Sequence, residues 1–160
     1  MAKPSVYVET TIIGYLKAWP RKDPLIAGQQ KLTREWWDRE RSDYDLVTSA
    51  VVRSEAAAGD ATAAAERLEV IDTLRFLDIT TETIVLAQSL LSRLAIPANE
   101  DRDAAHVAIA AAHGVTYLLT WNCRHLANAS LRPKIELVCR ELGYEPPIIC
   151  TPQELRKALP

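Results

Sequence analysis

The sequence has little cysteine, no excess of positive charge and no long apolar run. Its three cysteines, Cys123, Cys139 and Cys150, are an odd number at spacings that match no metal-binding pattern, so we expect free thiols in a reducing cytoplasm. The formal net charge is −2, so nucleic-acid binding would depend on local features or on a bound cation. The longest apolar run has six residues (107–112) and the N-terminus lacks a signal-peptide core, which predicts no membrane span.

Five short runs rich in β-branched residues alternate with helical patterns along the 160 residues. This alternation predicts an α/β fold, in which a central five-stranded parallel sheet carries helices on both faces. Because no repeat or long linker divides the chain, we expect a single domain over residues 1–160. Each run leads into threonine or serine, the residues that start helices. The expected strands are Ser5–Glu9, Asp45–Thr48, Phe76–Ile79, Thr116–Leu119 and Pro147–Cys150.

The most informative stretch is residues 99–125, where an acidic start is followed by a helix of alanine and other apolar residues. This pattern predicts a helix buried on most sides that ends at Gly114 and leads into a strand. Three acids at one helix start exceed what capping needs, which indicates that a cation binds there. Further helices are expected at Thr11–Lys17, Leu25–Arg41, Ser49–Ala58, Asp60–Leu74, Glu82–Leu94, Leu131–Leu142 and Pro152–Leu159.

Acidic side chains lie where the predicted strands end. In an open parallel sheet, ligands bind at the carboxyl ends of the strands near a topological switch point. Oxygen ligands that converge there suit a hard cation such as Mg²⁺ or Mn²⁺. The candidates are Glu9 with Thr10, Glu55 in the second helical region, Asp101 and Asp103 at the start of the alanine-rich helix, and Thr120 and Asn122 after the fourth strand.

Two other residues of this region have simpler interpretations. His106, three residues after Asp103, is better explained as a buried histidine hydrogen-bonded to a neighbour than as a ligand. Trp121 is better explained as a core residue than as a platform for stacking nucleobases. A zinc site has a weaker basis, because the spacing of its possible ligands fits no closed tetrahedral pattern. Those possible zinc ligands are His106, His113, Cys123 and His125.

Four segments resemble PIN domains, most closely the VapC-like branch: VYVETTIIGYL, TSAVVRSEAAAGD, DAAHVAIAAAHGVTYLLTWNCRHLAN and PIICTPQEL. The resemblance implies a three-layer αβα fold and a ribonuclease that uses Mg²⁺ or Mn²⁺. It places Glu9 where the family has its first-strand aspartate, matches Glu55 and Asp103 to the second and third acids, and puts the neutral Asn122 where many members have a fourth. Asp101 is the acid that can compensate for Asn122.

The resemblance also implies partners. A VapC-like protein is a toxin that acts on an RNA substrate, is held inactive by an antitoxin protein and forms a homodimer. One hypothesis is that Trp36 and Trp37, adjacent on one helix, leave one indole near the surface as an interface anchor; the alternative is that both are core residues.

Two alternative functions remain open at this point. The first is a catalytically weak or inactive PIN domain that binds RNA or protein. The second is a phosphoacceptor module, which fits poorly because Glu9 lacks an acidic neighbour.

Overall fold

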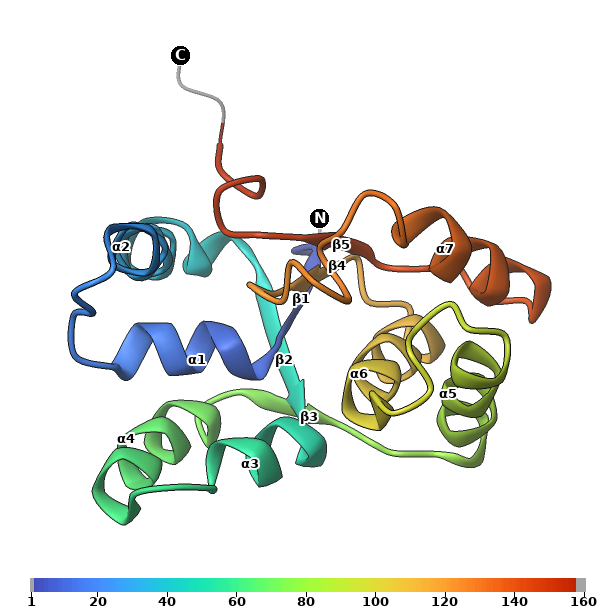
Figure 1. Cartoon of the computed structure of the whole chain (residues 1–160), viewed down its shortest axis with the longest axis horizontal. Helices are drawn as coiled ribbons and strands as arrows, with labels where there is room; N and C mark the ends of the chain where they lie inside the picture. The colour runs from blue at the N-terminus through green and yellow to red at the C-terminus, as the bar shows by residue number, and fades with distance from the viewer. Residues whose placement is uncertain (1, 158–160) are drawn as a thin grey trace.

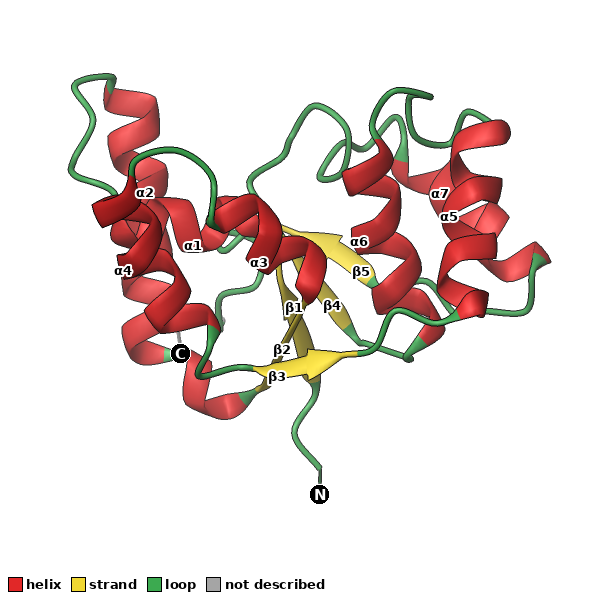
Figure 2. Cartoon of the chain, turned by 90° about the horizontal axis from the view of Figure 1, so that it is seen from below, coloured by secondary structure: helices red, strands yellow, loops and turns green. Residues whose placement is uncertain are grey.

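Strand β1 (Ser5–Val8) is the centre of a five-stranded parallel sheet in the computed structural model, which describes residues 2–157. The strand order is β3-β2-β1-β4-β5 (Figures 1 and 2). Val6, Tyr7 and Val8 have no exposed surface, because a central parallel strand is covered on both faces. This sheet confirms the predicted α/β architecture. The remaining strands are β2 (Asp45–Ser49), β3 (Arg75–Leu77), β4 (Tyr117–Leu119) and β5 (Ile148–Cys150).

The helices form two layers, one on each face of the sheet (Figure 1). The chain moves in one direction from β1 to β3 and in the other from β4 to β5, so right-handed crossovers place the helices of the two halves on opposite faces. The first layer holds α1 (Thr10–Lys17), α2 (Pro24–Arg39), α3 (Ala50–Ala56) and α4 (Ala61–Ile71), with a short 3₁₀ helix (Arg41–Asp43) after α2. The second holds α5 (Thr81–Ser92), α6 (Asp101–Ala112) and α7 (Arg132–Glu141).

The strand order reverses between β1 and β4, which makes their carboxyl ends the topological switch point. Val8 is paired with Leu119, and the backbone N–H of Glu9 donates to the carbonyl of Leu119 at 3.2 Å. The short helix α3 contacts α1 and α4 in its own layer and also α6 of the other layer. The residues that follow β1 and β4 and those of α3 and α6 therefore meet at one edge of the sheet.

Helix α6 is the buried helix that the sequence predicted. Eight of its twelve residues are buried, including Asp103 and His106. Its alanines let it pack closely against α5 and β4. The helix is followed by Gly114, whose φ of +67° is the left-handed conformation expected of a residue that ends a helix.

The last predicted helix, Pro152–Leu159, does not form in the described residues. The capping box is present, because Thr151 and Glu154 exchange hydrogen bonds of 3.2 and 3.3 Å. The chain makes only a turn at residues 152–155, and the carbonyl of Leu155 accepts a hydrogen bond from the indole of Trp36 instead of continuing a helix. Residues 158–159 of this prediction lie outside the described part of the chain.

The hypothesis that one of the paired tryptophans lies near the surface is wrong. Trp36 is 2% exposed and stacks on Tyr44, and Trp37 is 8% exposed beneath the guanidinium of Arg41. Neighbouring side chains on a helix point about 100° apart. Both tryptophans are nevertheless buried, because α2 packs on α1 and is also covered by the C-terminal turn. The exposed tryptophan is Trp19, in the α1–α2 connection.

The remaining expectations about the chain concern thiols and membranes. Cys123, Cys139 and Cys150 are free, as predicted. Within residues 2–157, no helix has the length and apolar character needed to cross a membrane.

The indole of Trp36 should contribute measurably to stability. We expect Trp36→Phe to lower the free energy of unfolding by about 1–3 kcal/mol, because it leaves the Leu155 carbonyl without its donor. The matched control, Trp19→Phe, should change it by less than about 0.5 kcal/mol, since Trp19 is exposed. Urea denaturation followed by circular dichroism measures both. Equal effects of the two substitutions would show that the Trp36 hydrogen bond contributes nothing.

Candidate active site

Glu9 lies directly after β1 and is 3% exposed. Its side chain caps α1 by accepting from the backbone N–H of Thr11 at 3.1 Å. The hydroxyl of Thr11 also donates to it, and so does that of Thr120, at 2.8 Å. All three donors converge on Oε2. The carboxylate is thus fixed between the ends of β1 and β4.

Glu55, on α3, is linked to a buried hydrogen-bond chain. Its Oε1 accepts from the hydroxyl of Thr10 at 3.0 Å and lies 2.6 Å from Nε2 of His106. A carboxylate only accepts, so Nε2 carries a hydrogen. On its other side, Nδ1 of His106 lies 2.8 Å from the hydroxyl of Tyr7, which lies 2.7 Å from Oγ of Ser49. His106 is therefore the buried, hydrogen-bonded histidine that was expected.

Asp103, in the first turn of α6, has partners from the segment after β4. The side-chain amide of Asn122 donates to its Oδ2 at 3.0 Å, and Nδ1 of His125 lies 3.2 Å from the same atom. The carbonyl oxygen of the Asn122 side chain accepts from the backbone N–H of His125 at 3.0 Å. Asn122 therefore uses both ends of its amide to hold this turn against α6.

Two hydrogen-bond chains, which the peptide bond between Glu9 and Thr10 joins into one network, connect most of the predicted site residues. From Glu9 the first chain passes through the Thr120 hydroxyl, which accepts from the backbone N–H of Asn122 at 2.9 Å, and on to Asp103. The second runs from Thr10, the neighbour of Glu9, to Glu55. Within the described residues, each of the three carboxylates accepts hydrogen bonds on one oxygen only. Each therefore keeps a second oxygen for a ligand.

The three carboxylates are not packed as tightly as a closed metal site. Among residues 2–157, the set whose ligand atoms all lie within 4.8 Å of one another is Glu100, Asp103 and His125. Glu9 and Glu55 belong to the wider network and not to this set. Asp101 is exposed and outside the network, because it is turned about 100° around α6 from Glu100.

Glu100 was counted among the three acids at the start of α6 but was not selected as a candidate ligand, and His125 and Tyr7 were also left out of the selected set. A usable signal existed for the first: Glu100 and Asp103 are three residues apart and so share a helix face. None existed for Tyr7, because it lies in an apolar strand and resembles a core residue. His125 entered the sequence analysis only through the disfavoured zinc set of His106, His113, Cys123 and His125. The structure does not bring that set together, since His106 contacts Glu55 while His113 lies 2.7 Å from the carbonyl of Asp78.

Burial sets the protonation behaviour of the acids. It raises the pKa of Glu9, although the Thr11 and Thr120 hydroxyls and the nearby His106 oppose the shift. Burial also raises the pKa of Asp103, against His106, Asn122 and His125. For Glu55, burial again acts upward, but His106, Thr10 and Arg102 together outweigh it and lower the pKa.

Trp121 is a core residue, as expected. It is 8% exposed, its indole donates to the hydroxyl of Thr33 at 2.7 Å, and its ring stacks with Tyr15. Its backbone N–H donates to the Thr11 hydroxyl at 2.8 Å. Trp121 therefore holds the turn after β4 against α1 and α2, and its ring is too buried to stack on a nucleobase.

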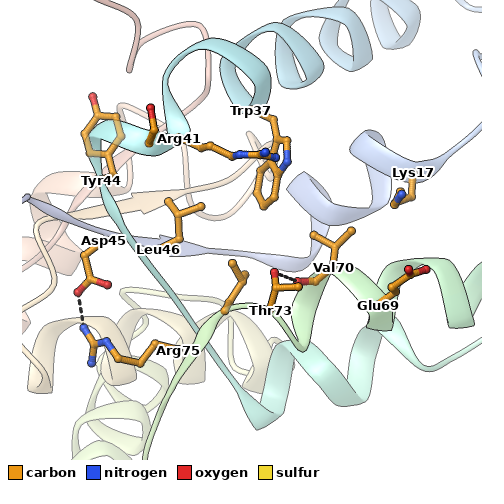
Figure 3. A pocket seen from close by; sticks show the side chains of 12 residues that line it. Lys17, Trp37, Arg41, Tyr44, Asp45, Leu46, Glu69, Val70, Thr73 and Arg75 are labelled. Atoms are coloured by element: carbon orange, nitrogen blue, oxygen red, sulfur yellow. Dashed lines mark hydrogen bonds and ion pairs between the residues drawn. The ribbon is translucent and has the colours of Figure 1, made fainter.

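A hollow of about 730 Å³ lies away from the acids, between the ends of α2 and α4 (Figure 3). Its lining includes Asp45 and Arg75, at the starts of β2 and β3, with Trp37 and Arg41 above them. Because the acids follow the carboxyl ends of the strands, this hollow belongs to the opposite edge of the sheet and is separate from the candidate site.

The raised pKa of Glu9 gives a pH prediction for the metal-free chain. A carboxyl whose folded pKa lies above its unfolded value binds more protons when folded, so its contribution to stability falls as pH rises through that window. Glu9→Gln removes this contribution. In EDTA at neutral pH, we expect the variant to melt higher than wild type, with a smaller loss of melting temperature above about pH 4.5.

The control for this measurement is Glu66→Gln, since Glu66 is exposed on α4. Its melting curves should follow those of wild type at every pH. A Glu9→Gln variant that melts below wild type at neutral pH would contradict the assignment of a destabilising buried charge to Glu9.

Comparisons with known proteins agree on the fold only. No family model matches the chain, and no curated protein matches it. Among solved structures, the chain is similar to a chain of VapBC2 from Rickettsia felis, crystallised bound to a DNA fragment from the promoter of these proteins. The match covers 92% of this chain and 98% of that one, with a TM-score of 0.59 and 13% sequence identity. The similarity confirms the three-layer, PIN-like fold that the sequence predicted.

Proposed function

We propose that this chain is a metal-dependent endoribonuclease, the toxin of a toxin–antitoxin pair. The observation that carries the proposal is the network that joins Glu9, Glu55 and Asp103 at the switch point of a PIN-like sheet. Burying three acids at one edge costs free energy unless a positive charge compensates them. Among residues 2–157, no group donates to the second oxygen of each acid, and carboxylate oxygens are the ligands that Mg²⁺ or Mn²⁺ prefers.

In this proposal Glu9, Glu55 and Asp103 hold the ion. A divalent cation supplies there a bound water of lowered pKa and positive charge for the scissile phosphate. Thr120 and Thr10 act through the carboxylates, since their hydroxyls donate to Glu9 and Glu55. Preorganised carboxylates of this kind need no rearrangement when the substrate arrives.

A protein with a net charge of −2 must offer positive charge locally if it is to bind the phosphates of an RNA substrate. Arg102 lies near Glu55 and lowers its pKa, and Arg124 is exposed on the segment after β4. Arg53 is paired with Asp72 at 3.0 Å and so is a poorer candidate. In this proposal Arg102 near Glu55 and Arg124, which precedes His125 in the sequence, act together with the ion and allow phosphate binding without a basic surface.

The partners in the proposal are an antitoxin protein and a second copy of the chain. Similarity to a chain of the VapBC2 complex supports the antitoxin, and no contact in the single chain bears on the homodimer. Size-exclusion chromatography with light scattering measures both assemblies. A catalytically inactive domain that binds RNA or protein is the second candidate, favoured by the neutral Asn122 at the end of the network.

The cleavage test compares Asp103→Asn with wild type. The variant should lose RNA cleavage by about 100-fold or more, the scale on which removal of one charge-stabilising group acts. It should also melt at or above the wild-type temperature in EDTA, because one buried charge is gone. The assay uses a panel of labelled RNAs with Mg²⁺, Mn²⁺ or EDTA.

Asp78→Asn is the control for this assay, since Asp78 is exposed and far along the chain from the network. It should cleave as wild type does. Binding of RNA by wild type without cleavage in any metal would reject the ribonuclease and favour the inactive binding module.

A second substitution addresses the missing fourth acid. Asn122→Asp replaces the amide that donates to Asp103 with a carboxylate, so two like charges would face each other at about the distance of the present 3.0 Å contact. We expect a lower melting temperature in EDTA, by about 2–4 °C for each kcal/mol lost. Mn²⁺ should bind more tightly by calorimetry. Unchanged Mn²⁺ affinity would mean that residue 122 contributes nothing to the ion's surroundings.

A further inference from the structure

At the Asp103 end of the network lie two possible metal ligands, Glu100 and His125, that the proposed ligand set does not use. Glu100, Asp103 and His125 offer two carboxylates and one imidazole whose ligand atoms all lie within 4.8 Å of one another. The two acids come from the start of α6, and the histidine comes from the turn after β4. Segments far apart in the sequence therefore bring oxygen and nitrogen donors to one point.

The distances within this group match those between ligands that share an ion. Ligand atoms each about 2.1 Å from a metal lie ~3.0 Å apart at 90° and ~3.4 Å apart at 109°. Nδ1 of His125 lies 3.2 Å from Oδ2 of Asp103 and 3.7 Å from Oε1 of Glu100. Small side-chain movements are enough to place all three atoms around one ion.

Asn122 fixes this arrangement without being a ligand. Its amide donates to Asp103, and its side-chain carbonyl accepts from the backbone N–H of His125. A neutral amide performs both tasks at once, whereas a carboxylate lacks the donor that Asp103 needs. Asn122, at the position of a fourth acid, thus positions Asp103 and His125. The additional ligands are Glu100 and His125.

The side chains are shielded but accessible. Asp103 and His125 are 12% and 17% exposed, and Glu100 is 34% exposed. An ion can therefore enter from the Glu100 side while the other two donors remain fixed. In the metal-free chain His125 pairs with Asp103, and it must give up the Nδ1 hydrogen when a metal binds.

We propose that Glu100, Asp103 and His125 form a mixed oxygen and nitrogen site, with His125 the ligand that makes the chain prefer transition metals to Mg²⁺. This inference rests on the proposed function, because Asp103 is shared with the ligand set of the nuclease. The preference follows from ligand chemistry: carboxylates serve Mg²⁺ well, whereas imidazole favours ions such as Co²⁺, Ni²⁺ and Zn²⁺.

Calorimetric titration of the full chain with Co²⁺ and with Mg²⁺ tests the assignment. His125→Ala should lower Co²⁺ affinity about tenfold or more, and change Mg²⁺ affinity by less than about threefold. Glu100→Gln should weaken both ions, since a carboxylate serves both. His113→Ala is the matched control, because His113 is an exposed histidine that contacts Asp78. It should bind both ions as wild type does.

Two further measurements make the result decisive. Melting curves in EDTA show whether His125→Ala is folded, and His125→Asn provides a second variant if it is not. The visible absorption of bound Co²⁺ should change in the folded His125 variant and stay unchanged in His113→Ala. Unchanged Co²⁺ affinity, or equal losses for Co²⁺ and Mg²⁺, would overturn the role of His125 and leave it as a structural ion pair.

The metal titrations and the RNA cleavage assay together distinguish the mixed site from the proposed ribonuclease activity. RNA cleavage by a wild type whose Co²⁺ affinity does not depend on His125 overturns only the mixed site. His125-dependent Co²⁺ binding by a wild type that cleaves no RNA in any metal overturns only the ribonuclease.

Discussion

The structure depends on holding buried carboxylates at the point where a parallel sheet changes direction. Glu9 directly follows Val6, Tyr7 and Val8, which have no exposed surface, and burial raises its pKa although neighbouring hydroxyls oppose the shift. Thr11 and Thr120 supply the hydroxyls, and these threonines lie where α1 begins and β4 ends. The same bonds that stabilise the charge therefore also join two strands and a helix.

His106 performs the corresponding task for Glu55. It is completely buried on α6, and it connects α3 to β1 through Tyr7. Most of the apolar core could be rebuilt with other residues of similar volume. The polar chain could not, since each member satisfies its neighbour and the loss of one leaves a buried group without a partner. This polar chain constrains the sequence more strongly than the core does.

The architecture was predictable because its signals are local. Alternation of β-rich runs with helical patterns predicted all five strands to within one or two residues, and the alanine-rich pattern identified α6. The final helix was wrong in the described residues, where the chain forms only a turn whose Leu155 carbonyl accepts a hydrogen bond from Trp36, more than a hundred residues earlier. Tertiary hydrogen bonds of this kind leave no trace in a local pattern.

The site was only partly predictable for the same reason. Glu9, Glu55 and Asp103 were selected because acids near the carboxyl ends of strands are unusual and because the chain resembles a family, and the structure places them in one region of the sheet edge. Their partners were not found: Tyr7 looks like a core residue, and His125 meets Asp103 only because the turn after β4 folds back onto α6. The resemblance offered Asp101 as the acid that compensates for Asn122, whereas Glu100 is the acid that lies close to Asp103 and His125.

The bond between Tyr7 and His106 joins residues 99 positions apart, and that between Thr120 and Glu9 joins residues 111 positions apart. Closing such long loops is slow, and it becomes favourable only when many other contacts form with it. Assembly of the acids should therefore coincide with the last step of folding. During synthesis, a nascent chain that ends before β4 contains all three carboxylates but cannot arrange them. The activity proposed for the chain would therefore be absent until nearly the whole sheet has been made.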